Sequence, residues 1–159
     1  MTDQEWIDLG KRAVACKGWR WMPGMLATST NNYHRPARIE SLDGDAYGLT
    51  VVPHAEGPVF AAHHEYGIAG EFPRGSTIPD LRDPATVGCL LSLVREAHPG
   101  CSIWVARDCV VDPLDDTEYM LDEREGWTVC GGSGDDYLSP YGSGDSEAAA
   151  LVAALEAAP

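Results

Sequence analysis

Apolar residues recur at helical spacing in three stretches of the 159-residue chain, and the first two stretches carry clear end signals. Thr2 and Glu5 have the spacing of a capping box, and the apolar pattern that follows them stops at Gly18. Further along, the pair Asp83-Pro84 combines a good N-cap with the residue favoured at the first helical position, and the His-Pro-Gly of residues 98–100 ends that stretch. We therefore expect one helix in each stretch.

The third helical stretch lies at the end of the chain and is rich in alanine. It starts near Asp145 or Ser146 and carries Leu151, Val152 and Leu155 on one face. Because small side chains allow a close approach, this face is suited to pack either on a sheet or on a second subunit. We expect the protein to be a homo-oligomer.

Strands are expected between the helices, where apolar and polar residues alternate. The expected segments are 19–22, 25–27, 38–42, 47–52, 101–106 and 126–130. Asp43-Gly44 predicts a hairpin turn between the third and fourth of these segments. The prolines and glycines of residues 54–78 predict an irregular loop with one short strand near Val59, and the glycine-rich residues 131–144 predict a second loop.

These elements predict a single α+β domain that spans residues 1–159. Alternating strands favour an antiparallel sheet packed with three helices over a parallel sheet buried on both faces. Residues 1–53 are expected to form a helix and hairpins, residues 54–78 an irregular region, and residues 79–159 an α-β-β-α unit.

Three segments resemble a family of small uncharacterised phage and prophage proteins: residues 19–25 (Trp-Arg-Trp-Met-Pro-Gly-Met), 78–91 and 147–159. The C-terminal half is also similar to the phage ABA sandwich domain, in which a Pro-Asp-Leu entry, here residues 79–81, leads into a helix, strands and an alanine-rich final helix. The resemblance rests on helix caps and apolar stripes. It implies a fold and a viral origin, with residence in the cytoplasm of a bacterial host, but no catalytic residue.

Charge is distributed unevenly along the chain. The 25 acidic and 11 basic residues give a net charge of −14, which argues against general binding to nucleic acid. Residues 11–38 nevertheless contain six basic residues and no acidic residue, whereas residues 108–147 contain twelve acidic residues and one basic residue. No apolar run approaches the roughly 20 residues of a membrane span, and the first five residues are acidic, unlike a secretion signal.

The basic segment interleaves its cations with aromatic residues and is the candidate ligand site. Guanidinium groups pair with phosphates while flat rings stack on bases, so this combination is typical of nucleotide binding. In a strongly negative protein such a site is expected to be a local, enclosed pocket. The predicted ligand-binding residues are Lys17, Trp19, Arg20, Trp21, Tyr33, His34, Arg35 and Arg38. The alternative is that Trp19 and Trp21 lie on one face of a strand and anchor the core, leaving Arg20 in solvent.

We expect a non-enzymatic phage protein that sequesters a nucleotide-derived immune signal of its host, either a cyclic oligonucleotide or an ADP-ribose derivative. No motif pairs a base with a nucleophile or has metal-ligand spacing, so no cofactor and no metal are expected. The five cysteines are odd in number and lack a Cys-x-x-Cys pair, which indicates reduced thiols. The alternative function is that the acidic residues 108–147 imitate the charge of DNA and inhibit a basic host nuclease or DNA-binding defence protein.

Overall fold

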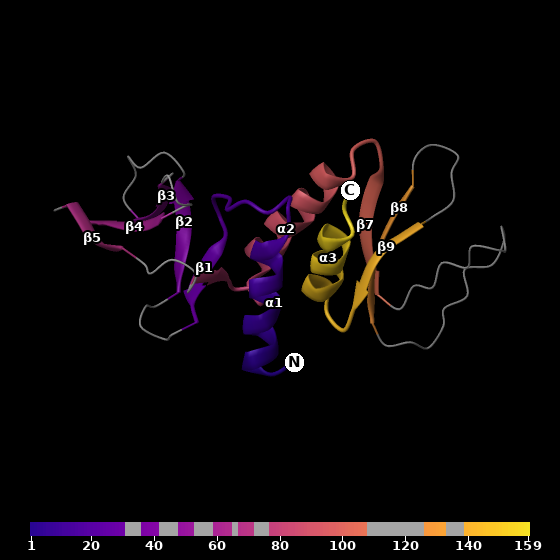
Figure 1. The fold of residues 1–159 in the computed structure, drawn as a ribbon, viewed down its shortest axis with the longest axis horizontal. Helices are drawn as coiled ribbons and strands as arrows, with labels where there is room; N and C mark the ends of the chain where they lie inside the picture. Colours follow the sequence, from indigo (N-terminus) through magenta and orange to yellow (C-terminus); the bar gives the residue numbers. More distant parts are fainter. Residues whose placement is uncertain are drawn as a thin grey trace. The chain divides into compact units, whose positions relative to one another are not determined.

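The structure, a computed structural model, describes residues 1–30, 36–41, 48–52, 59–64, 67–71, 77–107, 126–132 and 139–159 (Figure 1). Its elements are α1 (Asp3–Ala15), β1 (Leu26–Ser29), β2 (Ala37–Ser41), β3 (Gly48–Val52), β4 (Val59–His64), β5 (Gly67–Glu71), β6 (Thr77–Pro79), α2 (Pro84–Ala97), β7 (Ser102–Arg107), β8 (Trp127–Gly132), β9 (Ser139–Gly144) and α3 (Glu147–Glu156). Helices occur together with strands that pair mostly antiparallel, which confirms the expected α+β class.

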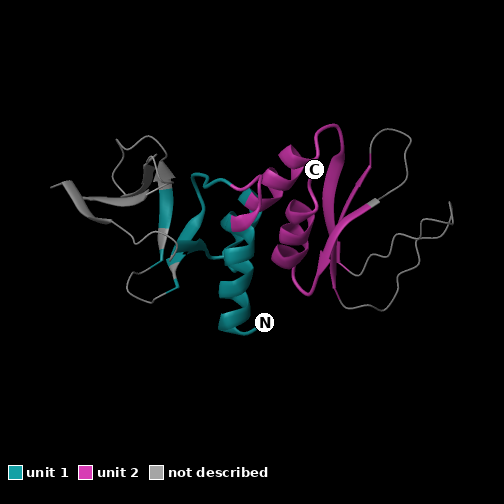
Figure 2. Ribbon diagram, viewed as in Figure 1, with its two compact units in different colours: residues 1–14, 20–89 teal, residues 15–19, 90–159 magenta. Residues whose placement is uncertain are grey.

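The chain divides into two compact units (Figure 2). Unit 1 comprises residues 1–14 and 20–89, and unit 2 comprises residues 15–19 and 90–159. The chain passes between the units after residues 14, 19 and 89, and the last of these points lies inside α2 and not at residue 79, where a subdivision was expected. Each unit is described by itself below.

Unit 1 contains a sheet in the order β5-β4-β3-β2-β1-β6. Neighbouring strands of this sheet pair antiparallel, except β2 and β3. These two pair in parallel, with Ile39 opposite Leu49. The expected hairpin between these two strands is therefore wrong, and its Asp-Gly turn lies outside the described residues. The long antiparallel ladder of β3 is with β4, from Gly48 opposite His63 to Val52 opposite Val59. Strands β2 and β3 are neighbours, as a hairpin requires, but they run in the same direction.

Residues 54–78, expected to be irregular, contribute three strands. The strand near Val59 is confirmed as part of β4, but β5 and β6 were not expected. Proline is compatible with strand ends and edges, because only a central position needs its missing N–H. Pro79 is the last residue of β6, which lies at the edge of the sheet next to β1. The proline and glycine content of residues 54–78 therefore did not exclude strands.

The first helix begins as expected. The amide of Thr2 donates to the Glu5 carboxylate, and the amide of Glu5 donates to Thr2 Oγ1 at 3.3 Å, which completes the capping box. The helix contacts β6 through Gly10, where an added Cβ would lie 3.1 Å from Ile78 Cδ1. A glycine at this position lets the helix backbone lie close to the strand.

Residues 19–22 do not form the expected strand. They belong to the irregular connection between α1 and β1, and a turn at Pro23-Gly24 follows them, with Gly24 at φ +94°. Two tryptophans two residues apart suit one face of a strand, but Trp21 is buried in this unit without being paired in the sheet. The tryptophan pattern therefore indicated a buried side chain, Trp21, but not a strand.

Unit 2 contains an antiparallel sheet in the order β7-β8-β9, with α3 packed on β8 and β9 (Figure 1). The third strand, β9, lies where a loop was expected. Its glycines 142 and 144 alternate with side-chain-bearing residues and face α3, and a Cβ on Gly144 would lie 2.6 Å from the Cβ of Ala149. In β9 the glycines allow the strand to pack closely against α3, and they do not mark a loop. The expected α-β-β-α unit is thus α-β-β-β-α.

The last helix has the expected start and covers its own sheet. Ser146 is the N-cap, and its Oγ accepts a hydrogen bond from the amide of Ala149 at 3.1 Å. Leu151, Val152 and Leu155 are at most 2% exposed. Of the two partners considered for this alanine-rich face, the sheet of the same chain is the one observed; the homo-oligomer remains a prediction.

Candidate functional site

The predicted ligand-binding residues are distributed over both units and beyond them. Lys17 and Trp19 belong to unit 2, Arg20, Trp21 and Arg38 belong to unit 1, and Tyr33, His34 and Arg35 lie outside the described residues. Their convergence on one pocket therefore remains a prediction.

Four of these residues lie within five positions of one another in the connection after α1: Lys17, Trp19, Arg20 and Trp21. Lys17 and Arg20 are exposed and Trp19 is half-buried, whereas Trp21 is only 8% exposed. The core-anchoring role weighed for the two tryptophans thus fits Trp21.

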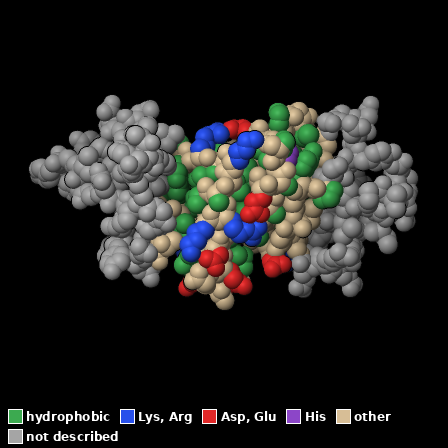
Figure 3. All heavy atoms as spheres, in the orientation of Figure 1, with side chains coloured by type: hydrophobic (Ala, Val, Ile, Leu, Met, Phe, Trp, Pro, Cys, Tyr) green, Lys and Arg blue, Asp and Glu red, His purple; other side chains and the backbone are tan. Residues whose placement is uncertain are grey.

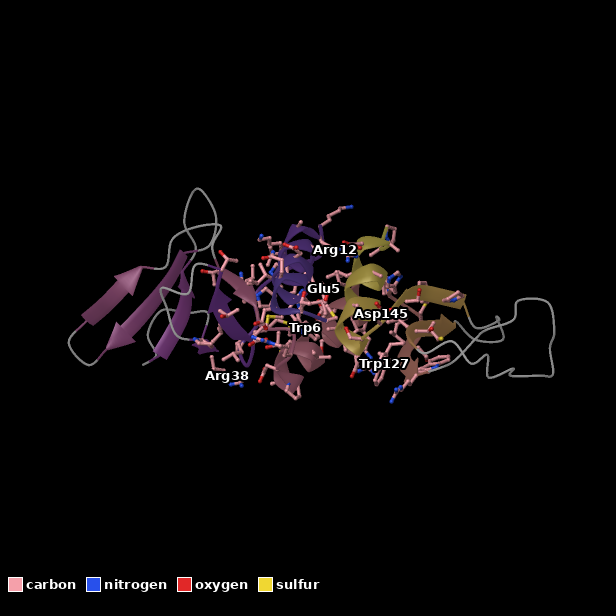
Figure 4. The ribbon with its side chains drawn as sticks, turned by 90° about the horizontal axis from the view of Figure 1, so that it is seen from below. Glu5, Trp6, Arg12, Arg38, Trp127 and Asp145 are labelled. Atoms are coloured by element: carbon pink, nitrogen blue, oxygen red, sulfur yellow. The ribbon has the colours of Figure 1, made fainter. Side chains whose placement is uncertain are left out.

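Arg38, on β2 and labelled in Figure 4, pairs with the carboxylate of Asp83. Its Nη2 lies 2.8 Å from Oδ1 of Asp83 and its Nη1 lies 3.1 Å from Oδ2, the paired geometry in which guanidinium and carboxylate bind most strongly. Nη1 also donates to the carbonyl of Gly24. The donors that were expected to hold a phosphate are therefore engaged within unit 1.

Asp83 connects Arg38 to the start of α2. Its Oδ2 accepts hydrogen bonds from the amide and the hydroxyl of Thr86, both at 2.9 Å, and Thr86 Oγ1 accepts in turn from the amide of Leu26 at 2.8 Å. The hydrogen bond from Arg38, followed by those from Thr86, holds the pKa of Asp83 well below its usual range despite its partial burial. The carboxylate stays ionised at neutral pH, so it caps and joins β1, β2 and α2 and has no proton to supply as an acid.

The cysteine nearest this network is not arranged as a nucleophile. Cys89 donates its S–H to the carbonyl of Pro23 at 3.7 Å. Burial, together with the charge of Asp83, raises the pKa of the Cys89 thiol. Because the thiolate is the reactive form, Cys89 is suited to packing beside the Gly24 turn.

Other cations on the described surface of unit 1 also lie beside carboxylates. Lys11 Nζ is 3.4 Å from Asp8, and Arg82 spans both oxygens of Asp80 and reaches Asp3 at 3.2 Å. On the face shown in Figure 3, basic side chains are interspersed with acidic ones. The basic character of residues 11–38 is thus partly neutralised by acids from elsewhere in the chain, which a count along that segment does not include.

In unit 2, a cluster of three reactive side chains was not predicted from the sequence. Tyr141 donates its hydroxyl to Sγ of Cys101 at 3.3 Å, and its ring lies 4.3 Å from the ring of His98, centroid to centroid. His98 is 8% exposed. We refer to Cys101, Tyr141 and His98 as the unit 2 cluster.

A bulge in the sheet places Tyr141 in this cluster. Val129 lies opposite Gly142 and Cys130 lies opposite Pro140, so Tyr141 has no residue opposite it on β8. Bulges of this kind redirect a side chain, and they are frequent beside functional sites. A Cβ on Gly131 would lie 2.5 Å from the Tyr141 ring, so glycine at that position leaves room for the ring.

No local signal marked the unit 2 cluster. In the sequence, His98 belongs to the expected end of the second helix, Cys101 to an expected strand and Tyr141 to an expected loop. Tyr141 is 40 residues from Cys101, and only the strand register brings the two together.

Comparisons with known proteins add no relative: no family model, curated protein or solved structure matches the chain significantly. The resemblance to phage proteins therefore stays a prediction. Within the described part of the chain, no helix has both the length and the apolar character needed to cross a membrane, and no three His, Cys, Asp or Glu side chains are grouped to hold a metal ion.

Proposed function

We propose that the protein captures a small nucleotide-like anion and holds it without cleaving it. The observation that carries this proposal is the acid-free segment 11–38, with six cations among aromatic residues in a chain of net charge −14. A cyclic oligonucleotide or an ADP-ribose derivative that serves as a host immune signal has the required chemistry, because it presents phosphates beside flat bases. In this proposal the protein is phage-encoded and acts in counter-defence.

The burial and pairing of the described side chains refine the proposed contacts. Lys17 and Arg20 are exposed and Trp19 is half-buried, which suits phosphate pairing and base stacking. Arg38 is engaged by Asp83 and Trp21 is buried, so neither is assigned a direct contact. The proposed contact set is therefore Lys17, Trp19 and Arg20, with Tyr33, His34 and Arg35 from the rest of the predicted set.

Calorimetric titration of the full chain with cyclic dinucleotides, cyclic trinucleotides and ADP-ribose derivatives tests the proposal. We expect one ligand class to bind, and Lys17→Ala and Arg20→Ala each to weaken binding by about tenfold, the effect of one charge-assisted hydrogen bond. Lys11→Ala is the matched control, since Lys11 belongs to the same basic segment but lies beside Asp8. The bound ligand should be recovered intact after the protein is denatured.

Two results would contradict the capture proposal. Heat signals that stay flat for every ligand would remove it, and recovery of a cleaved ligand would replace capture with catalysis. Equal loss of binding in Lys17→Ala and Lys11→Ala would show that only overall charge matters.

The acidic residues 108–147 support a second candidate, inhibition of a basic DNA-binding protein. Twelve acidic residues against one basic residue give this segment the charge density that such a partner recognises. Residues 108–125 and 133–138 lie outside the described residues, so the proposal rests on sequence. In this case the protein should displace duplex DNA from a basic nuclease at low salt and lose this ability as salt is raised, while no nucleotide binds.

A further inference from the structure

In the described part of the chain, the sheet of unit 2 has two edges, and they differ in how well they suit the addition of another strand. β9 contains Pro140, which has no amide N–H, and the bulge at Tyr141, and both features hinder pairing at an edge. β7 has neither feature, because its six residues pair with β8 in unbroken register from Ser102 to Arg107. Within the described residues, β8 is the strand neighbour of β7, and the other side of β7 is an edge (Figure 1).

The composition of β7 favours pairing with a second copy of the same strand. Ile103, Trp104 and Val105 are β-branched or aromatic, and Arg107 is the one charged residue of the strand. Antiparallel pairing reverses one copy against the other, so the two Arg107 side chains would lie at opposite ends and would not face each other. Regular edges of this kind are those through which chains associate unless a local feature blocks them.

Arg95 contacts the backbone of β7. It lies in the last turn of α2, and its Nε and Nη2 donate to the carbonyl oxygen of Ile103 at 3.3 Å and 3.2 Å. The carbonyls of a strand point alternately to its two sides, so those of every second residue of β7 point away from β8. The pairing with β8 is unbroken at Ile103, which favours an approach of the guanidinium from the outer side.

We propose that the Ile103 carbonyl points to the outer edge of β7 and that Arg95, by occupying it, blocks the pairing of β7 with β7 of a second copy. An added strand would need this acceptor, because antiparallel neighbours bond through the outward N–H and C=O groups of alternate residues. This role is independent of the proposed ligand capture. A homo-oligomer of the wild-type chain would then use another surface.

A guanidinium suits this role for two reasons. Its planar set of donors binds one acceptor through two nitrogens, whereas an ammonium group acts as a point charge. It also brings a positive charge to the edge, and charged side chains are a common means of preventing association at sheet edges. Arg95 and Ile103 are 8 residues apart, so the short connection between α2 and β7 keeps the two groups close.

Sedimentation velocity of the full chain over a range of protein concentrations tests the proposal. We expect Arg95→Ala to associate with a dissociation constant about tenfold below that of the wild type, the effect of one hydrogen-bond acceptor made available. This increase would occur against electrostatic repulsion, since the variant is more negative than the wild type, whose net charge is −14. Arg82→Ala is the matched control, because it removes the same charge from an arginine of unit 1 that pairs with Asp80. Arg95→Lys keeps the charge without the planar donors, so it should associate more than the wild type and less than Arg95→Ala.

Amide hydrogen exchange then locates the interface. In associated Arg95→Ala, the peptide that covers residues 102–107 should exchange more slowly than in the same variant after dilution, while the peptide that covers β9 should not change. Association without slower exchange of residues 102–107 would overturn the proposal, as would an Arg95→Ala that associates no more than the wild type. Equal association of Arg82→Ala and Arg95→Ala would also overturn it, because charge alone would then be the cause. If Arg95→Ala lacks the circular dichroism of the folded chain, Arg95→Lys decides, and association equal to that of the wild type would overturn the proposal.

Discussion

The guanidinium of Arg38 and the carboxylate of Asp83 form a paired contact that joins β2 to the first turn of α2 across 45 residues of sequence. The same carboxylate caps the helix through Thr86, whose hydroxyl also binds the amide of Leu26 in β1. One side chain thus holds three elements of unit 1 together. Its substitution should affect the stability of that unit more than the loss of a surface ion pair.

Asp83→Ala should lower the free energy of unfolding by about 1–2 kcal/mol through the lost cap alone, and Asp83→Asn by less because its amide oxygen still accepts from Thr86. Urea denaturation at pH 7 measures both changes. Asp8→Ala is the control, because Asp8 pairs with Lys11 in an exposed i,i+3 contact whose loss should leave the urea midpoint unchanged. A midpoint for Asp83→Ala equal to that of the wild type would contradict the role given to this residue.

The depressed pKa of Asp83 predicts a contribution to acid sensitivity. A carboxyl whose pKa is lower in the folded state stabilises the fold above its unfolded value of about 3.9, and this stabilisation disappears as pH falls towards the folded value. Between about pH 5 and pH 2, the wild type should therefore lose more stability than Asp83→Asn, which has no charge to lose. Urea midpoints measured across this range would show parallel curves if Asp83 did not contribute.

Gly142 and Gly144 should tolerate no side chain. A Cβ at Gly144 would lie 2.8 Å from the amide nitrogen of Ala150, and one at Gly142 would lie 2.5 Å from the carbonyl oxygen of the same residue, so helix backbone would have to move. We expect Gly142→Ala and Gly144→Ala each to destabilise the protein by about 1–3 kcal/mol or more.

The matched control for these two variants is Gly88→Ala. Gly88 lies in α2 with nothing within 4 Å of an added Cβ, so alanine should stabilise the helix by up to about 1 kcal/mol. Opposite signs for the same chemical change, measured by thermal or urea unfolding, would support the close contact of β9 with α3. A neutral Gly142→Ala would refute it.

His98 should stabilise the fold as a hydrogen-bond donor as well as a buried ring. His98→Phe keeps an aromatic ring beside Tyr141 but leaves the carbonyl of Ala154, a fully buried residue, without this donor. The expected cost is about 1–3 kcal/mol, the penalty for an unsatisfied buried polar group. His98→Gln, which restores an N–H donor, should recover part of it. Unfolding curves for His98→Phe and wild type that coincide would show that the ring alone matters.

The helix ends were predictable because their signals are local. The capping box at Thr2 and Glu5, and the caps at Asp83 and Ser146, each place donor and acceptor within three residues of one another, so the sequence contains the whole interaction. The strands of residues 54–78 and β9 were missed because proline and glycine were taken as signs of irregular chain. Whether a proline or a glycine is compatible with a strand depends on its position, at a sheet edge for proline and facing a closely packed helix for glycine.

For the candidate sites too, the sequence identified residues that lie close together along the chain but not contacts between distant residues. The sequence placed Lys17, Trp19 and Arg20 in one basic stretch among aromatic residues, and in the structure Lys17 and Arg20 are exposed and Trp19 is half-buried. The sequence could not show that Arg38 pairs with Asp83, or that Tyr141 contacts Cys101 and His98. These partners are up to 45 residues apart, and charge counts along a segment omit such pairings.

By itself the sequence determined the α+β class, the three helices with their caps and the uneven distribution of charge, because composition, periodicity and capping act over a few residues. Only the tertiary structure decided the parallel pairing of β2 with β3, the use of Gly142 and Gly144 as a contact surface for α3, and the partners of Arg38 and Cys101. Strand pairings, close backbone contacts and ion pairs join residues that are far apart in the sequence. Which partner each residue finds depends on the whole fold, so no local sequence pattern marks it.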